Sequence, residues 1–239
     1  MREEQTALPS ALGAANARNI GRMLFRGAYN LEVYGADLMP RHGRLIVAAN
    51  HLGFLDGALL CSSSPRPIHL LAKSEMFVPP MDKLMIGTGQ IPVDYESPDR
   101  DAIDRAMAVL SAERALGIFP EAHRGVGDVS RIRHGVAYLA TRSRAPIVPV
   151  ALLGTRLTGM TKNSLPPLRS RMVVVFGAPF TPDAPGDLDT RSALASVGEG
   201  IRQRLSDHVR DALASTGMQL PDDDTSLETI ANLQSGVRP

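Results

Sequence analysis

Short apolar runs alternate with amphipathic segments along most of the chain. Uninterrupted apolar runs of about four to eight residues are typical of buried strands, whereas apolar residues recurring about every third or fourth position form one face of a helix. The alternation predicts βαβ units, and hence a single α/β domain with a mainly parallel central sheet flanked by helices. We expect strands near residues 45–49, 68–72, 91–93, 118–119, 147–153 and 172–176, and helices near 11–29, 97–117, 136–140 and 190–215.

The two ends of the chain depart from this pattern. We expect an N-terminal arm and helix over residues 1–30, the main domain over 31–216, and a flexible C-terminal tail over the polar, aperiodic residues 217–239. The N-terminal helix carries basic residues beside apolar ones. It therefore either packs on the domain or lies on a membrane surface, and packing is the favoured alternative.

Composition narrows the possible partners and the compartment. The 239 residues have a formal net charge of +1, which argues against nucleic acid as a partner. The single cysteine, Cys61, excludes an internal disulfide framework and fits a reducing compartment. No apolar run approaches the roughly 18 residues of a membrane-spanning helix, and the N-terminus has no signal-peptide core. We expect a cytoplasmic protein, peripheral on the inner face of the membrane.

The first candidate for chemistry follows the apolar run at residues 45–49, where Asn50 and His51 end the run and Asp56 lies five residues after the histidine. Five residues turn about 140° beyond a full turn on one continuous helix, so the two side chains meet only if the chain bends, and Gly53 permits a bend. The Asp56 carboxylate then holds one imidazole nitrogen while the other takes a proton from substrate. The alternative is that Asp56 only caps a helix.

The second candidate follows the run at residues 117–119, where a proline precedes Glu121 and Arg124. A carboxylate accepts hydrogen bonds from hydroxyls, and a guanidinium binds phosphate through two donors. These two residues are therefore suited to an acceptor that carries hydroxyls and a phosphate. The alternative is an internal ion pair between Glu121 and Arg124 that closes the loop.

These stretches together resemble the glycerolipid acyltransferases, the lysophosphatidic-acid acyltransferase group. Asn50-His51 with Asp56 is similar to the family's NHxxxxD motif, and Phe119-Pro120-Glu121-Ala122-His123-Arg124 resembles its FPEGTR motif. Residues 89–94 (GQIPVD) and 145–152 (APIVPVAL) resemble two further blocks, in the family's order. The family usually has Arg after the V-D of the first of these blocks, where this chain has Tyr95, and Ala122-His123 replaces the usual Gly-Thr.

The resemblance implies an acyltransferase domain over residues 31–216. It would move a fatty acyl chain from acyl-CoA or acyl carrier protein to the hydroxyl of a lysophospholipid, in phospholipid biosynthesis, at a membrane surface and without a cofactor. His51 would be the general base, oriented by Asp56, and backbone N–H groups of that turn would stabilise the oxyanion. Substrate-binding roles are expected for Asn50, Phe54, Lys73, Glu121, Ala122, His123 and Arg124.

A non-catalytic lipid-binding or carrier-docking module is one alternative, and the presence of both His51 and Asp56 argues against it. Two other functions remain open. Because of Tyr95, the same chemistry on another polar lipid, such as a lyso-glycolipid, is the first alternative. The second is a metal-dependent hydrolase, for which His51, Asp56, Glu121, His123 and His134 would supply the ligands. Residues 76–81, between the expected strands, either border an acyl channel, touch the membrane or form a buried connector.

Overall fold

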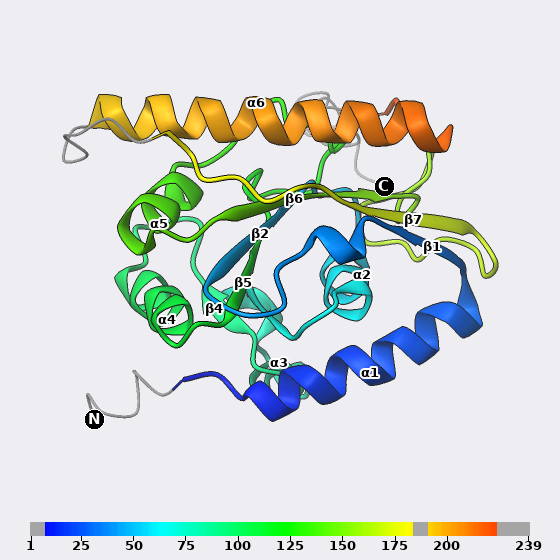
Figure 1. The fold of residues 1–239 in the computed structure, drawn as a ribbon. Helices are drawn as coiled ribbons and strands as arrows, with labels where there is room; N and C mark the ends of the chain where they lie inside the picture. Colours follow the sequence, from blue (N-terminus) through cyan, green and yellow to red (C-terminus); the bar gives the residue numbers. More distant parts are fainter. Residues whose placement is uncertain (1–7, 184–190, 224–239) are drawn as a thin grey trace, which may run out of the picture.

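A seven-stranded sheet forms the centre of the computed structural model, which describes residues 8–183 and 191–223 (Figure 1). Its strand order is β1-β7-β6-β2-β5-β3-β4, and every neighbouring pair is parallel except β6 and β7. This confirms the single α/β domain with a mainly parallel sheet. The strands are β1 Asn30–Tyr34, β2 Leu45–Ala49, β3 Ile68–Lys73, β4 Ile91–Val93, β5 Ala115–Ile118, β6 Ile147–Leu153 and β7 Arg171–Phe176.

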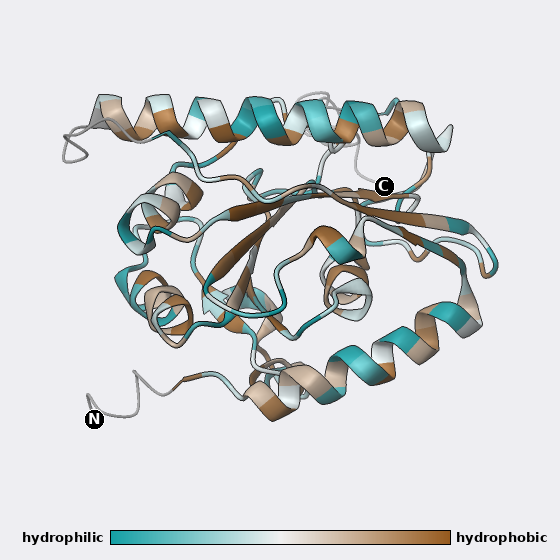
Figure 2. Cartoon of the chain, viewed as in Figure 1, coloured by the Kyte–Doolittle hydropathy of each residue, from teal (hydrophilic) through white to brown (hydrophobic). Residues whose placement is uncertain are grey.

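Helices cover both faces of the sheet, so the central strands are apolar on both sides. The helices are α1 Ala11–Ala28, α2 Asp56–Ser63, α3 Met81–Gly87, α4 Arg100–Ser111, α5 Gly135–Ser143 and α6 Arg191–Thr216. Helices α4, α5 and α6 pack into the core on one face, and α1 and α2 into the core on the other. Within β2, Ile46 and Ala48 join the first core, whereas Leu45, Val47 and Ala49 join the second. Figure 2 shows the strands as the most hydrophobic elements of the chain.

The helix expected to end at Gly117 is shorter than predicted. It is α4, which begins after the N-cap Asp99 and ends at Ser111, and Gly117 lies inside β5. A Cβ atom on Gly117 would lie 2.3 Å from a methyl group of Leu70 on the neighbouring β3. The glycine therefore permits close packing between two strands rather than ending a helix.

The pattern of apolar residues did not predict strand β1 or helix α3. Strand β1 pairs with β7 at one end of the sheet but is short and only partly buried, so no continuous apolar run marks it. Helix α3 has only seven residues and no buried residue. It overlaps the connector at residues 76–81, which is partly to fully exposed, so the buried-connector alternative is wrong, and a role at the acyl channel or the membrane stays a prediction.

The ends of the chain contact the domain wherever the structure describes them. Helix α1 packs against α2 and buries Ala14 and Phe25. Residues 217–223 of the expected tail lie against the domain, with Met218 and Leu220 packed on the core, whereas 224–239 and the arm at 1–7 lie outside the described residues. Of the helices in the described part, none is long and apolar enough to cross a membrane.

Candidate functional site

The candidate catalytic residues gather at one edge of the sheet. Strands β6, β2, β5 and β3 are parallel neighbours, so their carboxyl ends lie side by side. His51 follows β2, Glu121 follows β5, Thr155 follows β6 and Lys73 ends β3. In an open parallel sheet this edge is where ligands bind, since the loops there are free to carry functional side chains.

His51 and Asp56 meet as the spacing predicts. The imidazole Nδ1 of His51 donates to Oδ2 of Asp56 over 2.7 Å. Asp56 is fully buried and begins α2, whereas the His51 side chain is 15% exposed. Its ring stacks on Phe119, with the centroids 4.2 Å apart. Because Nδ1 carries the proton, Nε2 has a free lone pair and is able to accept a proton from substrate.

The Asp56 carboxylate is held by more than the histidine. Oδ2 also accepts from the backbone N–H of Leu52 over 2.6 Å and of Gly53 over 2.8 Å, and Oδ1 accepts from the hydroxyl of Thr155. A Cβ atom on Gly53 would lie 2.9 Å from the Thr155 carbonyl oxygen. Glycine therefore gives this turn the room to approach the loop after β6, and the carboxylate keeps one orientation.

The expectation that backbone N–H groups of this turn stabilise an oxyanion is wrong for three of them. The N–H groups of Leu52 and Gly53 are bound by Asp56, and that of His51 donates to Oε2 of Glu121 over 2.9 Å. A donor already bound to a carboxylate is not available to a developing negative charge. The turn instead uses these groups to fix its own shape.

Glu121 ties together the loops that follow β2 and β5. Its Oε1 accepts from the backbone N–H of Val129 over 2.8 Å, and its Oε2 accepts from His51, so it ties the two loops together. Burial raises the pKa of Glu121 to about 8, against the opposing effect of these two hydrogen bonds. Each oxygen is bound to one backbone N–H and keeps further acceptor capacity, so the binding of acceptor hydroxyls by Glu121 stays a prediction. There is no ion pair with Arg124 among the described residues, although the alternative interpretation required one.

Asn50 is also placed as a positioning residue rather than as a substrate contact. It is fully buried, and its amide bonds both the N–H and the C=O of Leu152 and the C=O of Gly127. It thereby joins the ends of β2 and β6 beneath His51. Ala122, with a φ of 62°, occupies the left-handed region that glycine adopts without cost, which matches the glycine of the family motif.

Arg124 and Phe54 lie together beside the His51–Asp56 pair. The Arg124 guanidinium is 5.5 Å from the centroid of the Phe54 ring, and its Nη1 donates to Asn163 over 2.6 Å. Burial lowers the pKa of Arg124, and the negative charge of Asp56 opposes that shift. Phe54 is 43% exposed, so this cation and this ring border the open side of the site.

A second basic group forms around His123. Its Nε2 is 3.4 Å from Nη2 of Arg133, whose Nη1 donates to the Tyr95 carbonyl over 2.5 Å and whose guanidinium lies 5.8 Å from the Tyr95 ring centroid. Burial lowers the pKa of His123, and the charges of Arg133 and Lys73 lower it further. Lys73 itself pairs with Glu75 over 2.7 Å. Arg133 thus brings a guanidinium to the tyrosine that replaces the family's arginine.

Neither a cysteine nucleophile nor the metal-dependent hydrolase finds the arrangement that its chemistry requires among the described residues. Burial raises the pKa of the Cys61 thiol to about 12, which disfavours the thiolate that a nucleophile needs. Within residues 8–183 and 191–223, no three His, Cys, Asp or Glu side chains converge as a metal site would require. The five residues that the hydrolase alternative needs therefore do not come together.

Sequence reasoning missed several residues of the site. Thr155 and Asn163 lie in a loop without periodicity, and Phe119 was interpreted only as part of a motif. One signal was present for Thr155, which follows the strand at 147–153 as His51 follows the strand at 45–49. Residues at the carboxyl ends of adjacent parallel strands share one edge, so both were candidates.

Comparison with known proteins agrees with the motifs. A family model described as Acyltransferase matches residues 30–153. The 1-acyl-sn-glycerol-3-phosphate acyltransferase of Cocos nucifera is 30% identical over 68% of this chain and 54% of its own length. An uncharacterised protein of Mycobacterium tuberculosis, Rv0502, is 28% identical over 72% of this chain and 49% of its own.

A solved structure shares the fold. The 1-acyl-sn-glycerophosphate (LPA) acyltransferase PlsC from Thermotoga maritima superposes with a TM-score of 0.62 at 17% identity, over 82% of this chain and 79% of that one. The chain spans about half the length of the curated relatives it matches.

Proposed function

Since this chain belongs to the acyltransferase family, we propose that it transfers a fatty acyl chain from a thioester, acyl-CoA or acyl carrier protein, to the hydroxyl of a lysophospholipid such as 1-acyl-glycerol-3-phosphate. The observation that carries the proposal is the 2.7 Å hydrogen bond from His51 Nδ1 to the buried Asp56, which leaves Nε2 as a base. An alcohol is a weak nucleophile at neutral pH and needs such a base when it attacks a thioester.

The proton and the electrons balance in two steps. His51 Nε2 takes the hydroxyl proton while the oxygen forms a bond to the thioester carbonyl carbon, and Asp56 stabilises the resulting imidazolium. The tetrahedral intermediate then collapses, the C–S bond breaks, and the imidazolium returns its proton to the leaving thiolate. The transfer needs no cofactor beyond its two substrates, and Cys61 takes no part.

The basic residues near the His51–Asp56 pair support an acceptor that carries a phosphate. Arg124 lies beside Phe54 close to Asp56, and Arg133, Lys73 and His123 form the second group. A guanidinium binds phosphate through two donors, which suits Arg124 and Arg133 to this role. Arg133 lies over Tyr95 and would replace the cation that the family places at that position. A lyso-glycolipid, which Tyr95 favours, is the second candidate, with unchanged chemistry at His51.

The chemistry of the acceptor also implies where the protein acts. A lysophospholipid is held at a lipid surface, so we propose that the protein acts there as a peripheral protein. Relatives named as 1-acyl-sn-glycerol-3-phosphate acyltransferases in Cocos nucifera and Borreliella burgdorferi support this class of acceptor.

Product analysis tests the proposal. Purified protein is given acyl-CoA or acyl carrier protein together with 1-acyl-glycerol-3-phosphate, other lysophospholipids or a lyso-glycolipid, and the products are identified by mass spectrometry. We expect acylated phospholipid from the wild type. The variant His51→Ala should lose about 10²- to 10⁴-fold in rate with an unchanged melting curve, and His42→Ala, at an exposed histidine, should lose nothing. Full activity of folded His51→Ala would refute the mechanism, and acylation of the glycolipid alone would move the acceptor to the second candidate.

A further inference from the structure

A basic cavity lies on the α1 side of the domain, away from the carboxyl edge of the sheet that carries His51. It has a volume of about 310 Å³ and is lined by Arg22, Arg26 and Arg41 together with Ser62, Ser63 and the apolar residues Leu31, Val33, Ala36 and Pro65. It lies beside the C-terminal end of α2, whereas Asp56 begins that helix at the catalytic edge. Among the described residues that line it, none is acidic.

The cavity has the groups that an anion requires. Arg22 donates to the carbonyls of Ser62 and Ser64, which directs its guanidinium along the cavity wall. Arg26 and Arg41 take part in none of the ion pairs between described residues. The pKa of Arg22 is lowered by burial and then by the neighbouring arginines, a repulsion that a bound anion would relieve.

A buried hydroxyl adds a second, independent indication. Ser63 lines the cavity and is only 6% exposed, and its hydroxyl has no hydrogen-bond partner among the described residues. Buried polar groups in native proteins almost always have a partner. A phosphate oxygen bound between the arginines would supply one.

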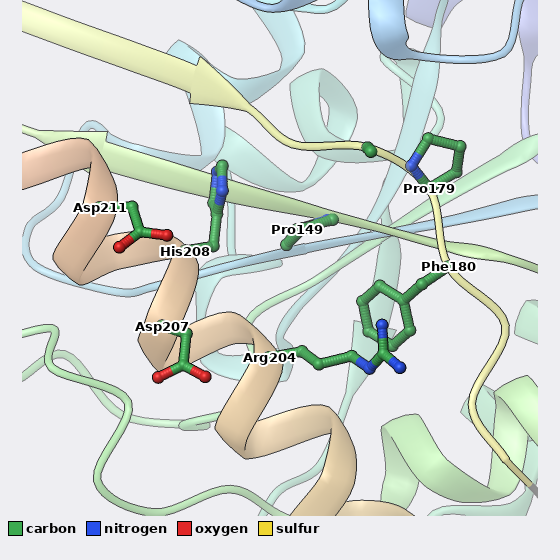
Figure 3. Close-up of a pocket in the computed structure, with 8 residues that line it drawn as sticks. Pro149, Pro179, Phe180, Arg204, Asp207, His208 and Asp211 are labelled. Atoms are coloured by element: carbon green, nitrogen blue, oxygen red, sulfur yellow. The ribbon is translucent and has the colours of Figure 1, made fainter. Parts of the chain in front are cut away.

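A second cavity has different chemistry. It measures about 290 Å³ between α6 and the segment after β7, and Arg204 lies over the Phe180 ring there, with its guanidinium carbon 4.9 Å from the centroid (Figure 3). Asp207 and Asp211 line the same cavity and offset the arginine. It therefore offers no net positive charge to an anion.

The outer face of α1 indicates where the anion comes from. Leu12, Ile20, Met23 and Leu24 are 57–76% exposed on the side of the helix away from the domain, and Arg22 and Arg26 flank that side. Helix α3 lies next to the N-terminal half of α1, since a Cβ atom on Gly13 would overlap the Gly87 carbonyl (Figure 1). It adds two exposed apolar residues, Leu84 and Ile86, to the same side of the domain. An exposed apolar face bordered by arginines is typical of a helix that lies in the headgroup region of a bilayer.

We propose that this face of α1 and α3 lies on a bilayer, and that the cavity lined by Arg22, Arg26 and Arg41 binds the phosphate of an anionic phospholipid headgroup. Its apolar wall, formed by Leu31, Val33 and Pro65, would contact the glycerol and the first part of the chains. The inference deepens the proposed function by naming the lipid surface on which it depends. Vesicle binding is measured without turnover, so failure here and failure of acyl transfer are distinguishable.

Vesicle sedimentation of the full chain provides the test. We compare phosphatidylcholine vesicles with vesicles that also contain phosphatidylglycerol, and expect the wild type to bind the second more tightly. Arg26→Gln/Arg41→Gln should weaken that binding about fivefold per lost charge. Leu12→Ser/Met23→Ser should weaken binding to both vesicles, because it removes apolar contact from the bilayer. The matched control Arg204→Gln/Arg210→Gln removes two exposed arginines from α6, on the opposite face of the sheet, and should bind as the wild type does.

Two further variants distinguish a built cavity from general surface charge. Arg26→Lys/Arg41→Lys keeps the charge but loses the two-pronged geometry, and Ser63→Ala removes the buried hydroxyl, so both should weaken phosphatidylglycerol binding. Lysine variants that bind as the wild type would refute the cavity as a phosphate site. Equal losses in the α6 control would refute the whole surface. Saturable binding of free glycerol phosphate without vesicles, unaffected by Leu12→Ser/Met23→Ser, would overturn the lipid as its source. Each folded variant should keep wild-type rates on monomeric short-chain substrates.

Discussion

Replacing Asp56 by asparagine tests the proposed mechanism most directly. Asp56 is fully buried and accepts four hydrogen bonds, from His51, Leu52, Gly53 and Thr155. Asparagine has nearly the same shape, and its oxygen is able to keep the bonds on the Oδ2 side while its amide group faces the Thr155 hydroxyl. The variant therefore removes the negative charge with little change of geometry.

The expected magnitude follows from that lost charge. The imidazolium that forms when His51 takes the proton loses its counter-ion, so kcat should fall by about 10²- to 10⁴-fold, the range for a positioned acid or base. In serine proteases, the same change at the aspartate that orients the catalytic histidine lowers kcat by about 10⁴-fold, the upper end of that range. KM should change little, because Asp56 has no exposed atom to contact a substrate. Hydrogen bonds to a charged group contribute about 1.5–3 kcal/mol each, so some loss of folding stability should accompany the loss of rate.

Initial rates with each substrate varied in turn, together with a urea unfolding curve and nitrogen NMR of the His51 ring, measure these effects. Asp99→Asn is the matched control: Asp99 caps α4 and accepts from the N–H of Ala102, and asparagine caps nearly as well, so both rate and stability should stay close to the wild type. A kcat for Asp56→Asn within about tenfold of the wild type, in a folded protein, would show that the carboxylate does not assist the base.

Three further substitutions test other parts of the site. Arg124→Lys should raise KM for the acceptor and lower kcat/KM about ten- to a hundredfold, since lysine lacks the two-pronged contact; equal changes in KM for the donor would exclude the phosphate role. Because the pKa of Glu121 is raised in the folded state to about 8, the free energy of unfolding should fall as pH rises from about 4.5 to about 8, by up to about 1.4 kcal/mol per pH unit. The variant Glu121→Gln should flatten this dependence. If melting experiments on the variant gave an unchanged slope, they would contradict the raised pKa of Glu121. Ala122→Gly should be neutral or stabilise by up to about 1 kcal/mol, because it relieves a left-handed backbone conformation; a clear loss of stability in urea unfolding would argue against that conformation.

The sequence alone determined the class of fold and the central pair of the site. A strand that is buried on both faces of a parallel sheet has a short run of apolar residues, and such a run can be identified from the local sequence. The strands β2, β3, β4, β6 and β7 therefore lie close to their predicted positions. The five-residue spacing from His51 to Asp56 was also interpretable locally, because a bend within five residues is enough to bring them together. Strand β1 and helix α3 lacked such a signal, being short and poorly buried.

Only the tertiary structure decided what surrounds that pair. Thr155 reaches Asp56 from 99 positions away, and Glu121 reaches the backbone of His51 from 70 positions away. Both contacts exist because β6 and β5 flank β2 in the sheet, and strand order is a property of the packed chain that periodicity does not encode. For the same reason, a motif identified Glu121 but not the residues that it binds. The arginines of the basic cavity lined by Arg22, Arg26 and Arg41 likewise come together only because Arg41, which precedes β2, packs beside α1. Local sequence fixes which side chains are available, and the long-range order of strands and helices fixes which of them meet, because hydrogen bonds and charges act over a few ångströms of space whatever their separation along the chain.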